Sequence, residues 1–413
     1  MKSDINRLMH ELNLDAIIVL GDETANRERE YMTNRAKARG IVIQKRDEEP
    51  VIIVNGMEID EAAKSGLKVL NWADFGMYET RTKYKDNPIA GTNELYNNVF
   101  KKLGISGRVA LFGTMEISSF SSLMLHLLDN TMGIELVTGN YDVSKLFQTA
   151  YETKSPEEIA ALKEAGKLTS EVVRRTWNFI SSHRAEGDAV GSRVVDKDGK
   201  PLTIGDVKRF IRLQQLELGL DDAEGCIFSQ GRDSAIPHST GENDEVLQVG
   251  KTIVFDIFPT GTDSGYYHDM TRTWCIGHAP VDVQTVYDDV FTIFKSVCKA
   301  LKVGQKTSIY QLMTLDYFEG KGHPTQRVRP GTLDGYVHGL GHGIGLNVHE
   351  APFFSEHSSY KLAPGNVITV EPGLYYPDKG LGVRIEDSIY LDENGTPQTL
   401  TDFPYDLVLP LKG

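Results

Sequence analysis

Three histidines, His338, His342 and His349, lie within the glycine-rich segment GYVHGLGHGIGLNVHE at residues 335–350. The segment also holds five glycines, and each would cost about 1 kcal/mol relative to alanine inside a helix. It therefore predicts strand and turn, where glycine lets a backbone or a ligand approach closely. The pattern is not the helical zinc motif, in which a glutamate base accompanies two histidines. If these histidines bind a metal, its other ligands must come from elsewhere in the chain.

Four acidic residues lie in or beside apolar runs that predict strands. Asp256 follows IVF, Asp269 follows a turn rich in Gly, Thr and Asp, Glu371 follows VITV, and Glu386 lies within VRIEDSIYL. A carboxylate is costly to bury unless it is paired or binds a metal. Four carboxylates with one or more histidines match what two adjacent divalent ions need. An imidazole ligand favours Mn, Fe, Co or Zn over Mg or Ca.

The elements that must position these residues fall into two domains. Over residues 1–150, short β-rich runs alternate with helical stretches and predict an α/β domain, with neither a GxGxxG motif nor a P-loop. The runs are DAIIVLG, RGIVIQ, EPVIIVNG, RVALFGT and IELVTG. A long helix then begins near residue 155, with Ser155 as the N-cap, Pro156 at the first position and Glu158 completing a capping box. We expect the second domain to span residues 151–413.

Within the second domain the pattern predicts helices at 203–218, 282–301 and 307–319. Strands are predicted near 225–230, within 252–276 and from the glycine-rich segment to the end of the chain. The acidic residues and histidines that could bind metal therefore lie on or next to strands.

Composition excludes several classes of protein. The chain has 413 residues, of which 40% are hydrophobic and 25% charged, and a net charge of −14. These values are typical of a soluble globular protein, and the negative charge argues against nucleic acid or an anionic membrane as a partner. Three distant cysteines form neither a disulfide framework nor a CxxC site. No apolar signal core or membrane-spanning run is visible, so we expect a cytoplasmic protein.

Four motifs, HGLGHGIGL, VHE, TVEPGLY and GVRIED, resemble the pita-bread metallopeptidases, which include aminopeptidase P, prolidase and methionine aminopeptidase, and their non-metal relative creatinase. The resemblance covers essentially the whole chain. It implies a creatinase-like α/β N-terminal domain over 1–150 and an α+β pita-bread catalytic domain over 151–413. It also implies a dinuclear metal site with five ligands: Asp256, Asp269, His342, Glu371 and Glu386. The two aspartates stand further apart than is usual in the family, so we expect a longer turn at 259–264 that leaves the ligands in place.

The resemblance also implies roles around the metals. Glu371 is the family's candidate for the catalytic proton transfer, and His349 matches the histidine that hydrogen-bonds the reacting carbonyl oxygen. His238 matches a substrate-binding histidine, with a structural role as the alternative. His338 either lines the substrate pocket or is an ordinary loop residue. Arg384 shares a strand face with Glu386 and either orients a ligand carboxylate or reaches the substrate.

The function that the resemblance implies is hydrolysis of the bond between an N-terminal residue and proline, so the expected partner is a peptide with proline at its second position. We expect an enzyme like aminopeptidase P, with an Xaa-Pro dipeptidase (prolidase) as the alternative. Creatinase-like or lyase chemistry, or a non-enzymatic binding module, is disfavoured because such relatives lack metal ligands that this chain keeps. The expected cofactors are two divalent ions, Mn first, with Co, Zn or Fe as alternatives, and the expected assembly is a homodimer.

The preferred length of the substrate depends on whether the site has a cationic side chain that binds the C-terminal carboxylate of a dipeptide. A strict dipeptidase must bind that carboxylate next to proline, and an arginine binds it in a bidentate manner. Between His349 and Glu371 the chain has no arginine. Arg327 and Arg329, in the turn-rich segment before His338, are the alternatives. We therefore expect peptides longer than two residues to be preferred over dipeptides.

Overall fold

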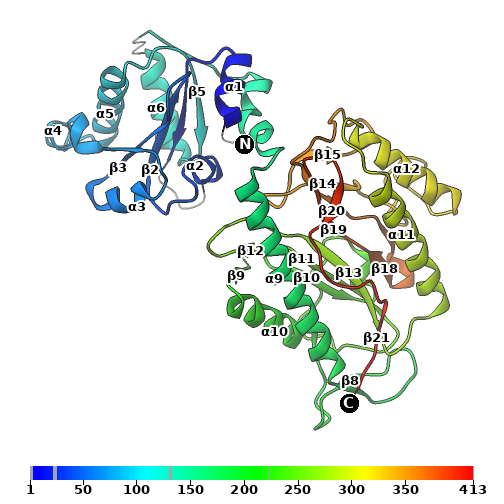
Figure 1. Cartoon of the computed structure of the whole chain (residues 1–413). Coiled ribbons are helices and arrows are strands. Elements are labelled where there is room, and N and C mark those ends of the chain that lie inside the picture. Colours follow the sequence, from blue (N-terminus) through cyan, green and yellow to red (C-terminus); the bar gives the residue numbers. More distant parts are fainter. Residues whose placement is uncertain (1–2, 22–25, 130–132, 223, 413) are drawn as a thin grey trace. The chain divides into compact units, whose positions relative to one another are not determined.

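The computed structural model describes residues 3–21, 26–129, 133–222 and 224–412. The chain divides into two compact units, Met1–Ala150 and Tyr151–Gly413 (Figure 1). Among the described residues, no helix is both long and apolar enough to cross a bilayer. Each unit has its own hydrophobic core.

The N-terminal unit is an α/β domain built on one six-stranded sheet in the order β4-β3-β2-β1-β5-β6. Its strands are β1 (Ala16–Leu20), β2 (Gly40–Lys45), β3 (Val51–Val54), β4 (Lys68–Asn71), β5 (Gly107–Gly113) and β6 (Ile134–Leu136). Its helices are α1 (Ser3–Glu11), α2 (Arg27–Met32), α3 (Ile59–Ala63), α4 (Met77–Lys83), α5 (Pro88–Leu103), α6 (Ile117–Asp129), α7 (Tyr141–Ser144) and α8 (Leu146–Tyr151). The five predicted strands are confirmed, whereas β4, a short and only partly buried run, was not predicted.

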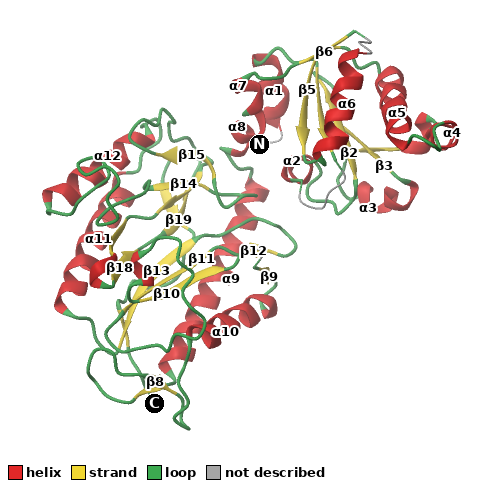
Figure 2. Cartoon of the chain, turned by 180° about the vertical axis from the view of Figure 1, so that it is seen from behind, coloured by secondary structure: helices red, strands yellow, loops and turns green. Residues whose placement is uncertain are grey.

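The helices of the C-terminal unit form two pairs. They are α9 (Pro156–Ser181), α10 (Ile204–Glu217), α11 (Val281–Ala300) and α12 (Thr307–Gly320), close to their predicted bounds. At the start of α9, the Ser155 hydroxyl accepts from the Glu158 backbone N–H and the Glu158 carboxylate accepts from the Ser155 N–H, which confirms the capping box. Figures 1 and 2 show α9 and α10 on one side of the strands and α11 and α12 on the other.

Two sheets lie between these helix pairs. One has the order β10-β11-β13-β21 and the other β15-β14-β16-β19-β20, beside a β17-β18 hairpin. The strands are β10 (Cys226–Gln230), β11 (Thr252–Ile257), β13 (Met270–Ile276), β14 (Gly341–Gly343), β15 (Glu350–Phe354), β16 (Val367–Val370), β17 (Gly373–Tyr376), β18 (Leu381–Arg384), β19 (Asp387–Leu391), β20 (Pro397–Thr399) and β21 (Val408–Leu409). Short pairs β7 (Arg184–Ala185) with β8 (Val194–Val195), and β9 (Leu220–Asp221) with β12 (Thr260–Gly261), complete the unit. The expected longer turn after Asp256 contains β12.

Glycine in the histidine-rich segment is required by the spacing of the strands. A Cβ on Gly341 would lie 2.1 Å from the Thr369 carbonyl oxygen, and one on Gly343 would lie 2.1 Å from the Ala351 carbonyl oxygen. Both neighbours are backbone atoms that cannot move aside without breaking the sheet. The predicted strand and turn are confirmed, and close packing of β14 explains the glycines on either side of His342.

A buried ion pair fixes the segment that follows β14. The side chains of Lys154 and Glu350 are each only 2% exposed, and Lys154 Nζ lies 2.7 Å from Glu350 Oε2. Lys154 also donates to the Tyr151 carbonyl, and Glu350 Oε1 accepts from the backbone and side-chain nitrogens of Asn347. The pair therefore ties the start of the C-terminal unit to the first residue of β15.

We predict that Lys154→Met lowers the free energy of unfolding of the C-terminal unit by about 3–5 kcal/mol, because it leaves a buried, uncompensated carboxylate. The matched double variant Lys154→Met/Glu350→Leu should recover most of that loss, since both charges are removed together. Urea unfolding followed by tryptophan fluorescence measures this in a Trp72→Phe background, where Trp177 and Trp274 report the C-terminal unit. A double variant as unstable as the single one would contradict the explanation.

Candidate metal centre

Two neighbouring strands, β11 and β13, and the segment between β18 and β19 bring three acidic side chains together. Asp256 pairs with Thr271 across β11 and β13, and Thr271 forms a bridge with Glu386 on the segment between β18 and β19. Residues directly opposite each other in a sheet project on the same face, and Asp269, two residues before Thr271, shares that face. The Thr271 hydroxyl donates to Glu386 Oε2 at 2.8 Å. The sheet register thus places three carboxylates on one surface.

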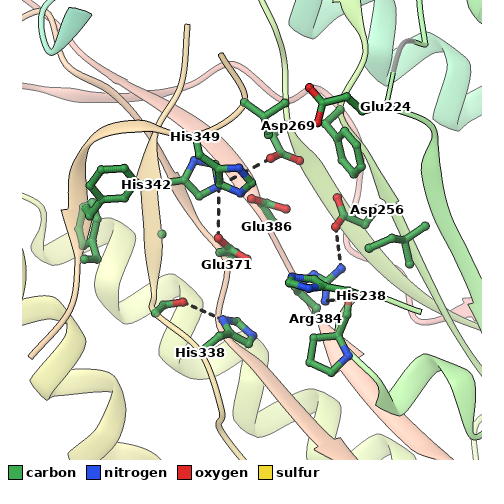
Figure 3. Close-up of a pocket in the computed structure, with 18 of the residues that line it drawn as sticks. Glu224, His238, Asp256, Asp269, His338, His342, His349, Glu371, Arg384 and Glu386 are labelled. Atoms are coloured by element: carbon green, nitrogen blue, oxygen red, sulfur yellow. Dashed lines mark hydrogen bonds and ion pairs between the residues drawn. The ribbon is translucent and has the colours of Figure 1, made fainter. Parts of the chain in front are cut away.

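His342 and Glu371 close this group from the second sheet. His342 lies on β14, and its Nε2 is 3.4 Å from Glu371 Oε1 and 3.8 Å from Asp269 Oδ2 (Figure 3). His342 Nδ1 lies 3.0 Å from the Gly343 carbonyl oxygen, which holds the proton on that nitrogen and leaves the Nε2 lone pair facing the carboxylates. Ligand atoms of Asp269, His342 and Glu386 all lie within 4.8 Å of one another.

Burial makes this cluster of negative charge unfavourable by itself. Burial first, and then the charge of neighbouring carboxylates, raises the pKa of Asp269 and of Glu386 well above the usual range. Burial raises the pKa of Glu371 to about 8, against the opposing effect of Arg384. Cations bound at the centre would remove this penalty, because metal ligation requires the deprotonated carboxylates and releases their protons.

Unpartnered oxygens show that the centre fits metal ions. Asp256 Oδ1, Asp269 Oδ1 and Glu386 Oε1 are buried and have no hydrogen-bond partner among the described residues. Buried polar atoms normally have a partner. Together with Nε2 of His342, these three oxygens form a set of oxygen and nitrogen donors of the kind that divalent ions such as Mn and Zn bind. The residues present therefore fit two divalent ions.

Arg384 is held in place by Asp256 and by two hydroxyl groups beside it. Its guanidinium is buried, with Nη2 2.6 Å from Asp256 Oδ2. Nη1 donates to the Tyr375 hydroxyl at 2.9 Å, and Nε donates to the Thr271 hydroxyl at 3.2 Å. Of the two roles considered for Arg384, these contacts favour orienting a ligand carboxylate. Thr271 and Tyr375 were not predicted as site residues; their only sequence signal is alternation with Asp269 and Gly373.

Every predicted site residue lines one cavity of about 470 Å³. His349 is accessible from the cavity, and its ring centroid lies 4.3 Å from that of His342. Partial burial of the imidazole lowers the pKa of His349. His338 Nδ1 lies 2.7 Å from the Gly339 carbonyl oxygen and Nε2 2.9 Å from the Tyr375 hydroxyl, and burial lowers the pKa of His338 to about 4. His238 is exposed on another wall. His338 therefore belongs to the cavity wall as a neutral, hydrogen-bonded side chain.

Comparison with known proteins identifies a family for each of the two units. Residues 160–393 match metallopeptidase family M24, and residues 3–137 match the creatinase/prolidase N-terminal domain. YqhT, an uncharacterized peptidase of Bacillus subtilis (strain 168), is 27% identical over 406 residues, 98% of both chains. An Xaa-Pro dipeptidase of Pyrococcus furiosus is 33% identical over 243 residues, 59% of this chain and 61% of the relative. The solved structure of an Xaa-Pro dipeptidase from Bacillus anthracis covers 99% of each chain with a TM-score of 0.74 and 24% identity, which shows that the pita-bread fold is shared.

We predict that Asp269→Asn or Glu386→Gln lowers the amount of bound metal and removes most hydrolytic activity while the fold is kept. The amide has the shape of the carboxylate but lacks the negative charge that neutralises a cation. Metal content after dialysis against Mn, Co or Zn, together with circular dichroism, measures both effects. Asp263→Asn, in the exposed turn before Asp269, is the matched control. Wild-type metal content and turnover in either variant would remove the residue from the centre.

Proposed function

Because this chain belongs to metallopeptidase family M24, we propose that it hydrolyses the bond between an N-terminal residue and a following proline. As a member of this family the chain is a metallo-exopeptidase. The observation that carries the proposal is the convergence of three buried, unpartnered carboxylate oxygens and His342 on one cavity. The preference for proline is supported by the name of the Pyrococcus furiosus relative, an Xaa-Pro dipeptidase.

The centre would hold two divalent ions, with Mn proposed first and Co, Zn or Fe as alternatives. Its proposed ligands are Asp256, Asp269, His342, Glu371 and Glu386. When bound, such ions lower the pKa of water so that hydroxide is available near neutral pH. Arg384 keeps Asp256 oriented for this task through its 2.6 Å contact. A homodimer and a cytoplasmic location stay predictions.

Glu371 is proposed as the group that accepts a proton from the attacking water and passes it to the leaving proline nitrogen. The Glu371 side chain is 20% exposed, compared with 12% for Asp256 and 6% for Asp269, so Glu371 is the most accessible carboxylate of these three. It comes directly after β16, and its backbone N–H donates to the Leu340 carbonyl. The backbone is thus fixed while the carboxylate faces the cavity.

His349 is proposed to donate a hydrogen bond to the carbonyl oxygen as negative charge develops on it. The lowered pKa keeps the ring neutral near pH 7, and a neutral imidazole still carries one N–H. His238, on the cavity wall next to Pro237, is proposed to contact the substrate. His338 is proposed to shape the pocket, since both its ring nitrogens have partners in the protein.

The alternative, a strict Xaa-Pro dipeptidase, is favoured by the names of two relatives. Against it, Arg384 is the one arginine among the described residues that line the cavity, and it is committed to Asp256. Arg327 is paired with Glu319 and Asp316, and the Arg329 side chain is 66% exposed. Neither lines the cavity. We therefore propose that the enzyme prefers peptides longer than two residues.

We predict that replacing His349 impairs catalysis, whereas replacing His342 impairs metal binding. His349→Ala should keep its metal and lose about 10²–10³ in kcat, because an oxyanion donor is removed. His342→Ala should lose metal affinity, because a nitrogen ligand is removed. Metal titration beside steady-state kinetics separates the two effects. If both variants lost metal to the same extent, the division of roles between these histidines would be wrong.

The proposed function is tested with Ala-Pro, Ala-Pro-Ala and Ala-Ala-Ala in the presence of Mn. We predict that Ala-Pro-Ala is cleaved with the highest kcat/KM, that Ala-Pro is weaker, and that Ala-Ala-Ala is not cleaved. Equal cleavage of the two tripeptides would contradict the requirement for proline. Activity confined to Ala-Pro, and lost in Arg329→Ala or Arg327→Ala, would instead establish a dipeptidase with a carboxylate-binding loop.

A further inference from the structure

Glu224 lines the same cavity but has no part in the roles described above. It lies between β9 and β10, and Figure 3 shows it among the cavity residues, on the same side as Asp256 and Asp269. It does not belong to the group of ligand atoms formed by Asp269, His342 and Glu386. Glu224 is therefore a carboxylate in the cavity in addition to those proposed as metal ligands.

The surroundings of Glu224 differ from those of the buried carboxylates. Its side chain is exposed, and its Oε1 accepts a hydrogen bond from the Tyr267 hydroxyl at 3.1 Å. No ion pair joins it to a lysine or arginine among the residues that the structure describes. The negative charge acts on the neighbouring His349, whose pKa it raises against the larger effect of burial. Glu224 is thus accessible to a ligand in the cavity.

Apolar side chains accompany this carboxylate. Ile227, Phe258 and Val348 line the same cavity, and Phe258 and Val348 belong to or pack against one hydrophobic cluster. A cavity that combines these apolar side chains with the Glu224 carboxylate fits an aliphatic group that carries a positive charge. The N-terminal residue of a peptide supplies such a charge from its α-ammonium, and lysine or arginine supplies a second one from its side chain.

We infer that Glu224 is a specificity-determining residue that binds a cationic group of the substrate's N-terminal residue. The inference rests on the proposed Xaa-Pro peptidase function, since it is the bond before proline that places this residue in the cavity. Tyr267 is a positioning residue for the Glu224 carboxylate. A hydrogen bond to a charged group in such a site corresponds to a change of about tenfold or more in binding.

The test uses the metal-loaded full-length enzyme, Glu224→Gln, and two peptides, Lys-Pro-Ala and norleucine-Pro-Ala. Norleucine has the aliphatic chain of lysine without its charge. A rise of about tenfold or more in KM for Lys-Pro-Ala alone would identify the lysine side chain as the bound group. A similar rise for both peptides would identify the α-ammonium. In each case kcat and metal content should change little, and Tyr267→Phe should raise the same KM values by a smaller factor.

Glu242→Gln is the matched control, because Glu242 is an exposed glutamate that does not line the cavity. Unchanged KM values for both peptides in Glu224→Gln would overturn the inference and leave the proposed function standing. Loss of metal in this variant would also overturn it, by making Glu224 part of the metal centre. If the wild-type enzyme cleaved neither peptide, the proposed function would fail and this inference with it.

Discussion

Repulsion between buried carboxylates is the constraint on which the rest of this structure depends. Asp256, Asp269 and Glu386 are buried, and each keeps one oxygen without a hydrogen-bond partner among the described residues. Burial first, and then the neighbouring carboxylates, raises the pKa of Asp269 and of Glu386, and both effects favour a positive charge at the site. Arg384 supplies one such charge, and bound divalent ions would supply the others. The arrangement that is unfavourable in the protein alone is the one that would bind metal.

The strands can hold these carboxylates close together because the strand backbones pack directly against one another. Gly341 and Gly343 leave no room for a side chain against the neighbouring carbonyl groups, and His342 between them is fixed by its bond to Gly343. Helices on both sides cover the sheets with apolar cores. The buried Lys154–Glu350 pair then holds the segment that leads to His349. Rigidity of this kind matters because a catalytic group must stay near its reacting geometry.

Two kinds of acidic residue therefore share one cavity and differ through their surroundings. The buried carboxylates repel one another and favour metal ions. Glu224 is exposed, accepts a hydrogen bond from one tyrosine hydroxyl and shares the cavity with apolar side chains, so its carboxylate suits an organic cation. All of these side chains are carboxylates, so their chemistry alone would not distinguish metal binding from binding of an organic cation. Burial and the distance to other charges do.

Local sequence determined most of the elements and pointed to much of the proposed ligand set of this protein. The capping box of Ser155 and Glu158, the helix bounds and five of the six strands of the N-terminal unit follow from patterns of neighbouring residues. The motifs around His342, Glu371 and Glu386 single out those side chains. Only the tertiary structure decided that Arg384 contacts Asp256, 128 residues away along the chain, that Thr271 and Tyr375 support the cluster, and that Glu224 faces the cavity. The reason is physical: helix caps and periodicity act between residues a few positions apart, whereas these contacts depend on how distant strands pair, and no short segment encodes that register.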